Sequence, residues 1–329
     1  MPELRQNLAT KEWVVIATER ARRPEDFHKD RPARAPLPER LDSCPFCPGN
    51  EARTGDSVYA LGEPWRVRAV RNKFPALTPE ARLDPGEAGP YLRRAGQGVH
   101  EVIIESPSHA KHLALLEPEQ VREAFFVYRE RFRESWKNPS VCTSLVFKNH
   151  GASAGTSLEH PHAQLIGSPV VPAHLRHRVD QAEAYLRKHG ACVFCDMRKE
   201  ELRQGARILA DTEHFTAFVL FAALSPFHIW VLPKRHAASF GEATDAELAD
   251  LSAVMRVLLR KLHVGLDNPD FNFLIQSVPQ DRGHAGSFHW YLSLVVRVSQ
   301  MAGFELGSGM FINTTLPEES ARFLNSVQA

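Results

Sequence analysis

Four of the five cysteines in this 329-residue chain lie in two C-x-x-C pairs, Cys44/Cys47 and Cys192/Cys195. Each pair is followed by an apolar stretch that ends in a turn with a histidine. A second histidine follows the turn histidine after 51 residues in the first half and after 53 in the second. Two thiolates at this spacing and two distant imidazoles are the donor set of a closed tetrahedral zinc site. We therefore expect two metal centres, with the ligand sets Cys44, Cys47, His109 and His160, and Cys192, Cys195, His236 and His289.

This pattern leaves two alternatives open. A lone C-x-x-C pair also fits thioredoxin-like redox chemistry, although neither pair here stands at the strand-to-helix step of a βαβ unit. His100, His112 and His150 are rivals to His109 as a ligand of the first centre. A centre with four protein ligands has no open position for a substrate, so both metals would stabilise the fold and the chemistry would come from elsewhere.

The segment that best fits that chemistry is NHGASAGTSLEHPHAQ, residues 149–164. Gly151, Gly155 and Ser157 make a small-residue loop whose backbone N–H groups can approach a phosphate closely. His162 stands two residues after the expected ligand His160, so on an extended segment both side chains point the same way. A histidine held in this way can attack phosphorus, and Gln164, on the same face, can donate a hydrogen bond to the phosphoryl oxygens.

The second half of the chain carries Tyr291 where the first half carries His162. The expected ligand, His289, is retained there, while the nucleophile is not. We therefore expect the second half to keep the scaffold and to lack the chemistry.

Matching secondary-structure elements must position these residues in both halves. Short apolar strands are expected at 100–109 and 228–236, and again at 144–147 and 271–275. Amphipathic helices are expected from Pro118 and, behind a capping box, from Thr244. The sequence thus predicts a duplicated α+β unit with a boundary near residues 176–190, and loops at 24–43 and 85–90; the alternative is a chance recurrence of common residues.

Composition and charge exclude several classes of protein. Lys and Arg number 40 and Asp and Glu 39, so the net charge of +1 leaves no basic stripe for nucleic acid or a membrane surface. The chain has no apolar run of about 18 residues that could span a bilayer, and its first residues lack the apolar region of a signal peptide. We expect a cytoplasmic protein with no nucleic-acid or membrane partner.

The chain resembles the histidine-triad superfamily and, more narrowly, the galactose-1-phosphate uridylyltransferase family with its branch of ADP-glucose phosphorylases. The residues that carry the resemblance span nearly the whole chain and lie at 7–13, 20–24, 67–75, 149–164 and 303–313. The resemblance implies an α+β fold of two tandem histidine-triad-like domains, each an antiparallel sheet with packed helices, at residues 1–178 and 179–329. It also implies two Zn²⁺ ions per chain.

For function, the resemblance implies a nucleotidyltransferase that moves UMP from UDP-glucose to galactose 1-phosphate, in a ping-pong cycle through a covalent uridylyl-His162. The alternative within the family is an ADP-glucose phosphorylase, which transfers an adenylyl group from ADP-glucose to phosphate. An alternative of another class is a non-catalytic nucleotide-sugar sensor, which the presence of both His162 and Gln164 disfavours.

The resemblance also assigns roles to residues outside the metal sets. Gln164 and Ser157 would bind the phosphoryl oxygens, in a cradle shaped by Asn149 and Gly155. Arg20 and Arg23 match family positions that contact the substrate phosphates, and Asn72 matches a position near the nucleoside. Glu305 matches a position that contacts hexose hydroxyls from the other subunit, which implies a homodimer with shared active sites.

Three differences bear on the nucleobase. Enterobacterial-type uridylyltransferases have Asp where this chain has Lys73, and their C-terminal segment does not match residues 303–313. They also use a Glu/His set at the second metal site. This chain is therefore more similar to the archaeal-type and plant-type branch, and the base of the donor stays open between uracil and adenine.

Overall fold

The computed structural model describes residues 2–17, 27, 36–83, 90–280 and 286–328. Its main element is a sheet of ten strands in the order β3-β4-β5-β7-β6-β11-β12-β10-β9-β8, in which every neighbouring pair is antiparallel. The first five strands in this order are β3 (Ser57–Leu61), β4 (Val67–Arg71), β5 (Val99–Ile104), β7 (His162–Ser168) and β6 (Thr143–His150). The other five are β11 (Phe271–Gln276), β12 (Tyr291–Val296), β10 (Ile229–Pro233), β9 (Phe215–Val219) and β8 (Ile208–Asp211).

The strand order is the same when it is followed inward from either edge of the sheet. From the β3 edge the chain order of the strands is first, second, third, fifth, fourth, and from the β8 edge it is the same. The two series meet where β6 pairs with β11, with Asn149 opposite Asn272. The predicted duplicated α+β fold, with an antiparallel sheet in each half, is confirmed, and the two half-sheets form one continuous sheet.

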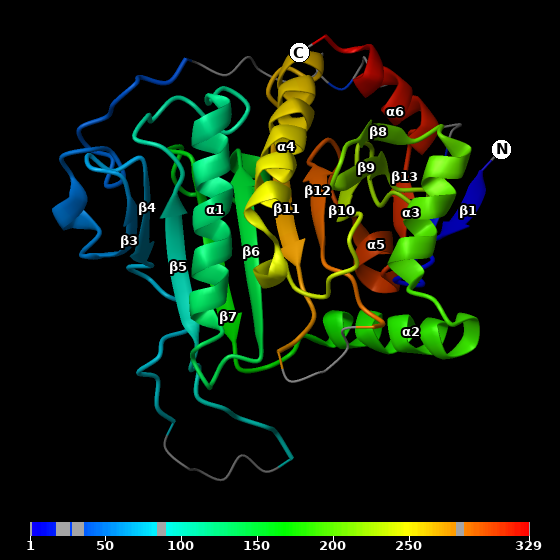
Figure 1. Ribbon diagram of the computed structural model, residues 1–329, viewed down its shortest axis with the longest axis horizontal. Coiled ribbons are helices and arrows are strands. Elements are labelled where there is room, and N and C mark those ends of the chain that lie inside the picture. The colour runs from blue at the N-terminus through cyan, green and yellow to red at the C-terminus, as the bar shows by residue number, and fades with distance from the viewer. Residues whose placement is uncertain (1, 18–26, 28–35, 84–89, 281–285, 329) are drawn as a thin grey trace.

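Two long helices lie side by side over one face of this sheet (Figure 1). They are α1 (Pro118–Ser135) and α4 (Asp245–Gly265). Pro118 occupies the first turn of α1, where a missing N–H costs nothing, and Thr244 and Glu247 form the capping box of α4. Their apolar faces pack on the sheet and are buried, as the helical spacing predicted.

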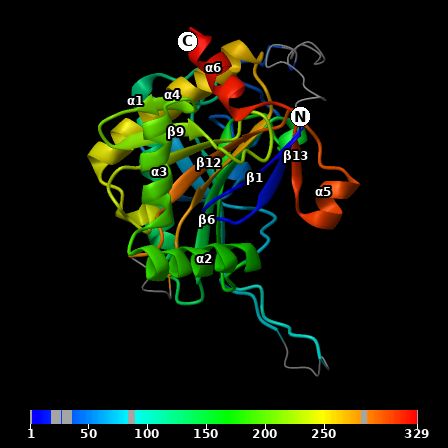
Figure 2. The same cartoon turned by 90° about the vertical axis from the view of Figure 1, so that its right-hand side faces the viewer.

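Smaller elements complete the fold. A second sheet joins β1 (Glu3–Gln6), β2 (Trp13–Ile16) and β13 (Phe311–Asn313), and so brings the two ends of the chain together. The other helices are α2 (Ala173–His189), α3 (Val193–Gln204), α5 (Gly303–Ser308) and α6 (Pro317–Ser326). Figure 2 shows α2 below the sheet. The expected domain boundary between residues 178 and 179 falls inside α2. Among the described residues, no helix is long and apolar enough to cross a bilayer.

Alternation along β7 decides which side chains face the helices. Ala163 and Leu165 belong to the main hydrophobic core together with Val121 and Phe125 of α1. Neighbouring side chains of a strand point to opposite faces, so His162 and Gln164 lie on the face away from α1. A second, smaller core lies there and includes Cys44, Phe46, Cys47 and residues of β4 and β5.

His228 makes the stability of this fold depend on pH. The side chain is buried before β10, its Nε2 lies 2.8 Å from Ser293 Oγ, and burial lowers the pKa of His228 to about 3. The unfolded chain therefore binds a proton near pH 6.5 that the folded chain does not, and stability falls as the pH drops below that value. From this residue we expect a loss of about 2 kcal/mol between pH 6.5 and pH 5.

Urea unfolding of the wild type and of His228→Gln at pH 7.5 and pH 5 measures this contribution. The variant should lose less stability on acidification than the wild type, by about 2 kcal/mol. The same change at the exposed His189 is the control and should leave the wild-type pH dependence intact. Equal losses in the wild type and in His228→Gln would contradict the assignment.

Candidate active site and metal clusters

The first Cys/His set comes together from three separate segments. Cys44 and Cys47 lie in the loop that covers β4 and β5, His109 lies in the turn after β5, and His160 lies two residues before the start of β7. One ligand atom from each of the four residues lies within 4.8 Å of every other, and all four residues are buried. His160 Nδ1 lies 3.8 Å from Cys44 Sγ and 3.5 Å from Cys47 Sγ. The four side chains that the sequence singled out therefore share one site.

The protonation of this cluster suits a metal cation. His160 Nε2 lies 2.9 Å from the carbonyl oxygen of Ser106, which can only accept, so Nε2 carries the proton and Nδ1 presents its lone pair to the two sulfurs. Burial lowers the pKa of His160 to about 4, which keeps the ring neutral. Burial also raises the pKa of the Cys44 thiol, a penalty that a bound dication reverses.

The second set forms an equivalent cluster in the other half. Cys195 Sγ lies 3.5 Å from His236 Nδ1 and 3.4 Å from His289 Nδ1, and Cys192 completes the group. A hydrogen bond from the Cys192 thiol lowers the pKa of Cys195, and the two imidazoles act in the same direction. Both clusters could therefore hold a metal ion.

The rivals to His109 lie elsewhere in the structure. His100 Nε2 is 2.9 Å from Gln164 Oε1, His112 Nε2 is 3.3 Å from His263 Nδ1, and His150 Nε2 is 2.9 Å from Asn268 Oδ1. Among the described residues, only the two expected groups bring four ligand atoms together.

One ring nitrogen of His162 is hydrogen-bonded to the backbone, and the other is left to react. Its Nδ1 lies 2.8 Å from the carbonyl oxygen of His160, an acceptor, so Nδ1 carries the proton and Nε2 bears the lone pair. Burial lowers the pKa of His162, so the imidazole is neutral. Phe46, between the two cysteines of the first cluster, packs edge-on against the ring at a centroid distance of 5.3 Å. A neutral imidazole with a free, oriented lone pair is a nucleophile.

A buried ion pair lies on the opposite side of the strand from this imidazole. Lys148 Nζ donates to Glu105 Oε2 at 2.6 Å and to the carbonyl oxygen of His162 at 3.1 Å, and the Tyr128 hydroxyl donates to the same carboxylate. All three side chains are buried. Sequence analysis did not identify them; the available signal was a lysine at a core-facing position of the strand 143–150.

The loop between β6 and β7 leads into His162; together with Asn149 on β6 and Gln164 on β7 it is named the cradle. Gly151 and Gly155 have φ angles of 87° and 86°, which a residue with a Cβ rarely adopts, and they flank the short 3-10 helix Ala152–Ala154. Asn149 lies near the end of β6, where its carbonyl oxygen accepts from the Thr156 hydroxyl at 2.9 Å, and Ser157 is exposed on the loop. Gln164, two residues after His162 in β7, lies on the same face as His162. Gly151, Gly155 and Ser157 thus belong to the loop that leads into β7, and Gln164 lies on β7 on the same face as His162.

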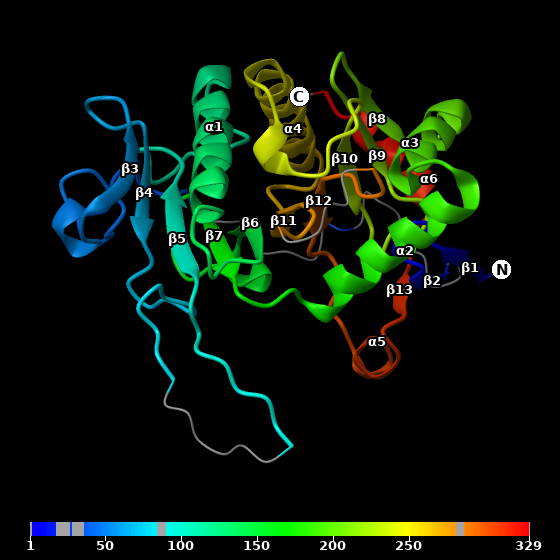
Figure 3. The same ribbon diagram turned by 60° about the horizontal axis from the view of Figure 1, so that its bottom comes forward.

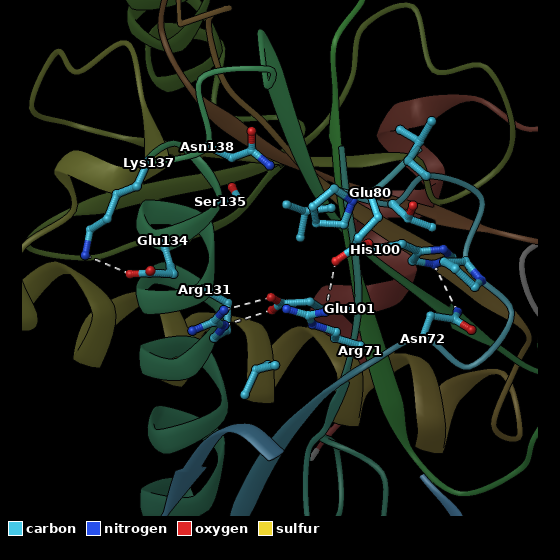
Figure 4. Close-up of a pocket in the computed structure, with 16 residues that line it drawn as sticks. Arg71, Asn72, Glu80, His100, Glu101, Arg131, Glu134, Ser135, Lys137 and Asn138 are labelled. Atoms are coloured by element: carbon cyan, nitrogen blue, oxygen red, sulfur yellow. Dashed lines mark hydrogen bonds and ion pairs between the residues drawn. The ribbon is translucent and has the colours of Figure 1, made fainter. Parts of the chain in front are cut away.

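Other expected contacts lie outside this cradle or outside the described residues. Asn72 follows β4, and its Nδ2 lies 3.1 Å from His100 Nε2, beside a cavity of ≈ 370 Å³ (Figure 4). Glu305 belongs to α5, which projects from the body of the molecule (Figure 3), and it accepts a hydrogen bond from Ala302 N at 3.0 Å. Arg20 and Arg23 lie outside the described residues.

In the second half, Tyr291 occupies the position that His162 has in the first, as the first residue of its strand. The ring is buried, and its hydroxyl accepts a hydrogen bond from Arg178 Nη1 at 2.7 Å. This half therefore keeps the cluster and the strand without an available nucleophile.

The duplicated sheet-and-helix unit, with an H-x-H sequence that ends on the first residue of β7, is the arrangement expected of a nucleotidyltransferase of this resemblance. Two family models match the chain: galactose-1-phosphate uridyl transferase, N-terminal domain, over residues 1–172, and its C-terminal domain over residues 178–310. The chain belongs to the galactose-1-phosphate uridyl transferase family.

Relatives with different named activities are similar to nearly the whole chain. The ADP-glucose phosphorylase of Arabidopsis thaliana is 32% identical over 99% of this chain and 93% of its own. The galactose-1-phosphate uridylyltransferase of Thermotoga maritima is 26% identical over 100% and 99%. A crystal structure of the Arabidopsis phosphorylase with bound ADP-glucose superposes with a TM-score of 0.84, at 29% identity and coverage of 100% and 99%.

The two clusters predict the metal content and the effect of losing a ligand. Protein purified without chelators should contain two metal ions per chain by elemental analysis, because two complete donor sets are present. Cys44→Ser should contain one, and its free energy of unfolding should fall by more than about 3 kcal/mol, because metal binding contributes directly to folding.

Cys142→Ser is the matched control for this change. Cys142 lies outside both clusters, where its thiol donates to the carbonyl oxygen of Pro169 at 3.3 Å. The Cys142→Ser variant should keep both metal ions. One metal or none in the wild type would contradict the duplicated-site interpretation.

Proposed function

We propose that this chain is a nucleotidyltransferase of the UDP-glucose–hexose-1-phosphate uridylyltransferase type, which moves UMP to galactose 1-phosphate through a covalent uridylyl-His162. The observation that carries this proposal is the 2.8 Å hydrogen bond from His162 Nδ1 to the carbonyl oxygen of His160. It leaves the lone pair on Nε2, beside an amide side chain and a glycine loop suited to a phosphate.

The proposed cycle has two displacements at phosphorus. In the first, His162 Nε2 bonds to the α-phosphorus of the donor while the bond to the bridging oxygen breaks, and glucose 1-phosphate leaves. In the second, a phosphate oxygen of the acceptor bonds to the same phosphorus while the bond to Nε2 breaks. Each step inverts configuration, so the whole reaction retains it. The neutral imidazole needs no separate base.

Electrostatic stabilisation of the phosphoryl group is assigned to the cradle. Gln164 and Ser157 donate to the phosphoryl oxygens, and the loop shaped by Asn149 and Gly155 brings backbone N–H groups close to them. Asn72 contacts the nucleoside. Arg20 and Arg23 provide guanidinium groups for the substrate phosphates, a role for which a planar fork of donors is well suited.

An ADP-glucose phosphorylase is the second candidate function. The observation in its favour is the 32% identity with the Arabidopsis phosphorylase over 99% of this chain. In this case the same His162 carries an adenylyl group and inorganic phosphate is the acceptor. The chemistry at Nε2 is unchanged, and the two functions differ in the base and the acceptor.

The proposal extends to the assembly and its metals. Each cluster holds Zn²⁺, which with four protein ligands supplies structural stability and no substrate position. The chain divides into domains at 1–178 and 179–329. It acts in the cytoplasm as a homodimer, in which Glu305 on the projecting helix α5 reaches the hexose in the partner's active site.

Intact-mass measurement after incubation with UDP-glucose or with ADP-glucose, each alone, tests the function. We expect a uridylyl adduct from UDP-glucose, mapped to His162 by peptide analysis. An adenylyl adduct from ADP-glucose alone would transfer the assignment to the phosphorylase. Tight binding of a nucleotide sugar with no adduct from either donor would contradict covalent catalysis and favour a sensor.

His162→Asn removes Nε2 and keeps an amide that can donate to the His160 carbonyl. We expect it to fold like the wild type, to form no adduct, and to lower kcat by about a thousandfold or more. His189→Gln on the surface of α2 is the control and should keep full activity. Unchanged turnover in His162→Asn would exclude His162 as the nucleophile.

A further inference from the structure

The two primary amides of the cradle each have their oxygen in a hydrogen bond with another side chain. Gln164 Oε1 lies 2.9 Å from His100 Nε2, and Asn149 Oδ1 lies 2.7 Å from Asn272 Nδ2. One end of an amide side chain only donates and the other only accepts, and an ionised phosphoryl oxygen only accepts. The direction in which each amide points therefore decides whether it attracts or repels a phosphate.

Backbone geometry fixes the proton of His100. Ala76 N lies 3.0 Å from His100 Nδ1, and because a backbone N–H can only donate, Nδ1 bears the lone pair. The neutral ring then carries its proton on Nε2 and donates to Gln164 Oε1. Asn72 does not compete for this proton: its Oδ1 accepts from Phe74 N at 2.9 Å, so its Nδ2, 3.1 Å from His100 Nε2, is itself a donor and makes no hydrogen bond with the ring N–H. Figure 4 shows Asn72 beside His100 at the cavity wall.

Backbone geometry fixes the orientation of Asn272 in the same way. Its Nδ2 lies 2.9 Å from the carbonyl oxygen of Ala154, which can only accept, and its Oδ1 accepts from Arg297 Nε at 2.5 Å. The same Nδ2 donates to Asn149 Oδ1. Asn272 belongs to β11, so this donor comes from the second half of the chain, across the junction of the two half-sheets.

We infer that His100 and Asn272 are positioning residues, which hold the oxygens of Gln164 and Asn149 so that both NH₂ groups are available to the transferred phosphoryl group. This inference rests on the proposed function and deepens it. Without these donors each amide can rotate by half a turn, which places its oxygen against the phosphoryl oxygens. The second half of the chain, which has no nucleophile of its own, thus contributes to the chemistry of the first.

A double-mutant cycle tests the first of these pairs. The readout is the single-turnover rate of His162 nucleotidylation, with the donor that labels the wild type. His100→Asn keeps an acceptor for Ala76 N and removes the donor to Gln164, and we expect a loss of about tenfold in the rate with little change in donor affinity. His100→Gln places an amide where Nε2 lay, and it should recover part of the rate.

The Gln164→Ala background separates positioning from a structural role. If His100 acts through Gln164, adding His100→Asn to Gln164→Ala should cause no further loss. Losses that multiply in the double variant would overturn the inference. A wild type that forms no adduct with any donor would overturn the proposed function, and this inference with it.

Asn272→Asp, an isosteric change, tests the second pair. The introduced carboxylate can only accept, so Asn149 should turn its NH₂ toward it and away from the phosphate. We expect about a tenfold loss in the wild-type background and no further loss in Asn149→Ala. Asn325→Asp is the control. Asn325 lies on α6 and its amide donates to the carbonyl oxygen of Ile208 in β8, so this change should keep the wild-type rate. If Asn272→Asp fails to fold, the His100 cycle decides the inference alone.

Discussion

The hydrogen bond between His162 Nδ1 and the carbonyl oxygen of His160 is the interaction on which the candidate active site depends. The two residues that make this hydrogen bond are held by further contacts. The imidazole of His160 belongs to the first Cys/His cluster and donates to Ser106, and the Lys148 ammonium holds the carbonyl of His162 itself. The loop of Cys44 and Cys47, the turn that contains Ser106, and strand β6 with Lys148 thus all contact the short segment 160–162. Because each partner is buried, the imidazole has one orientation and one tautomer before any substrate arrives.

The proton positions in this site follow from main-chain atoms whose hydrogen-bonding role is fixed. Carbonyl oxygens of Ser106, His160 and Ala154 accept, and the N–H of Ala76 donates. A side chain paired with such an atom loses the freedom to exchange donor and acceptor. Main-chain atoms of a strand or tight turn move little, so the polarity they impose costs no reorganisation during a reaction.

The periodic parts of the fold could be predicted from sequence. Helices α1 and α4 and the strands that flank them follow spacings of 3.6 and 2, and these are local properties. Both Cys/His clusters could be predicted as well, because thiols and imidazoles are rare enough that their repetition is informative. The union of the half-sheets could not, since an open strand edge has the same alternation as a paired one.

The roles of His100 and Asn272 depend on contacts that no local pattern encodes. His100 meets Gln164 across 64 residues of chain, and Asn272 meets Asn149 across 123. Its residue type alone makes His100 a candidate metal ligand, and only the register of β5 against β7 places it beside the amide of Gln164. The buried Lys148–Glu105 pair was missed because a charged residue in an apolar strand usually indicates a solvent-facing position.

The pairing of β6 with β11 has a consequence for how the chain is made. Strand β6 leaves the ribosome with its β11 partner still 123 residues away. At about 5 to 20 residues per second, the N-terminal half waits for about 6 to 25 s with one edge of β6 unpaired, although β7 can pair with the other edge. Its free N–H and C=O groups would accept a strand from any neighbouring chain, as an exposed sheet edge does. The strand pairing that places Asn272 beside the cradle is therefore, during synthesis, an exposed sheet edge at risk of pairing with another chain.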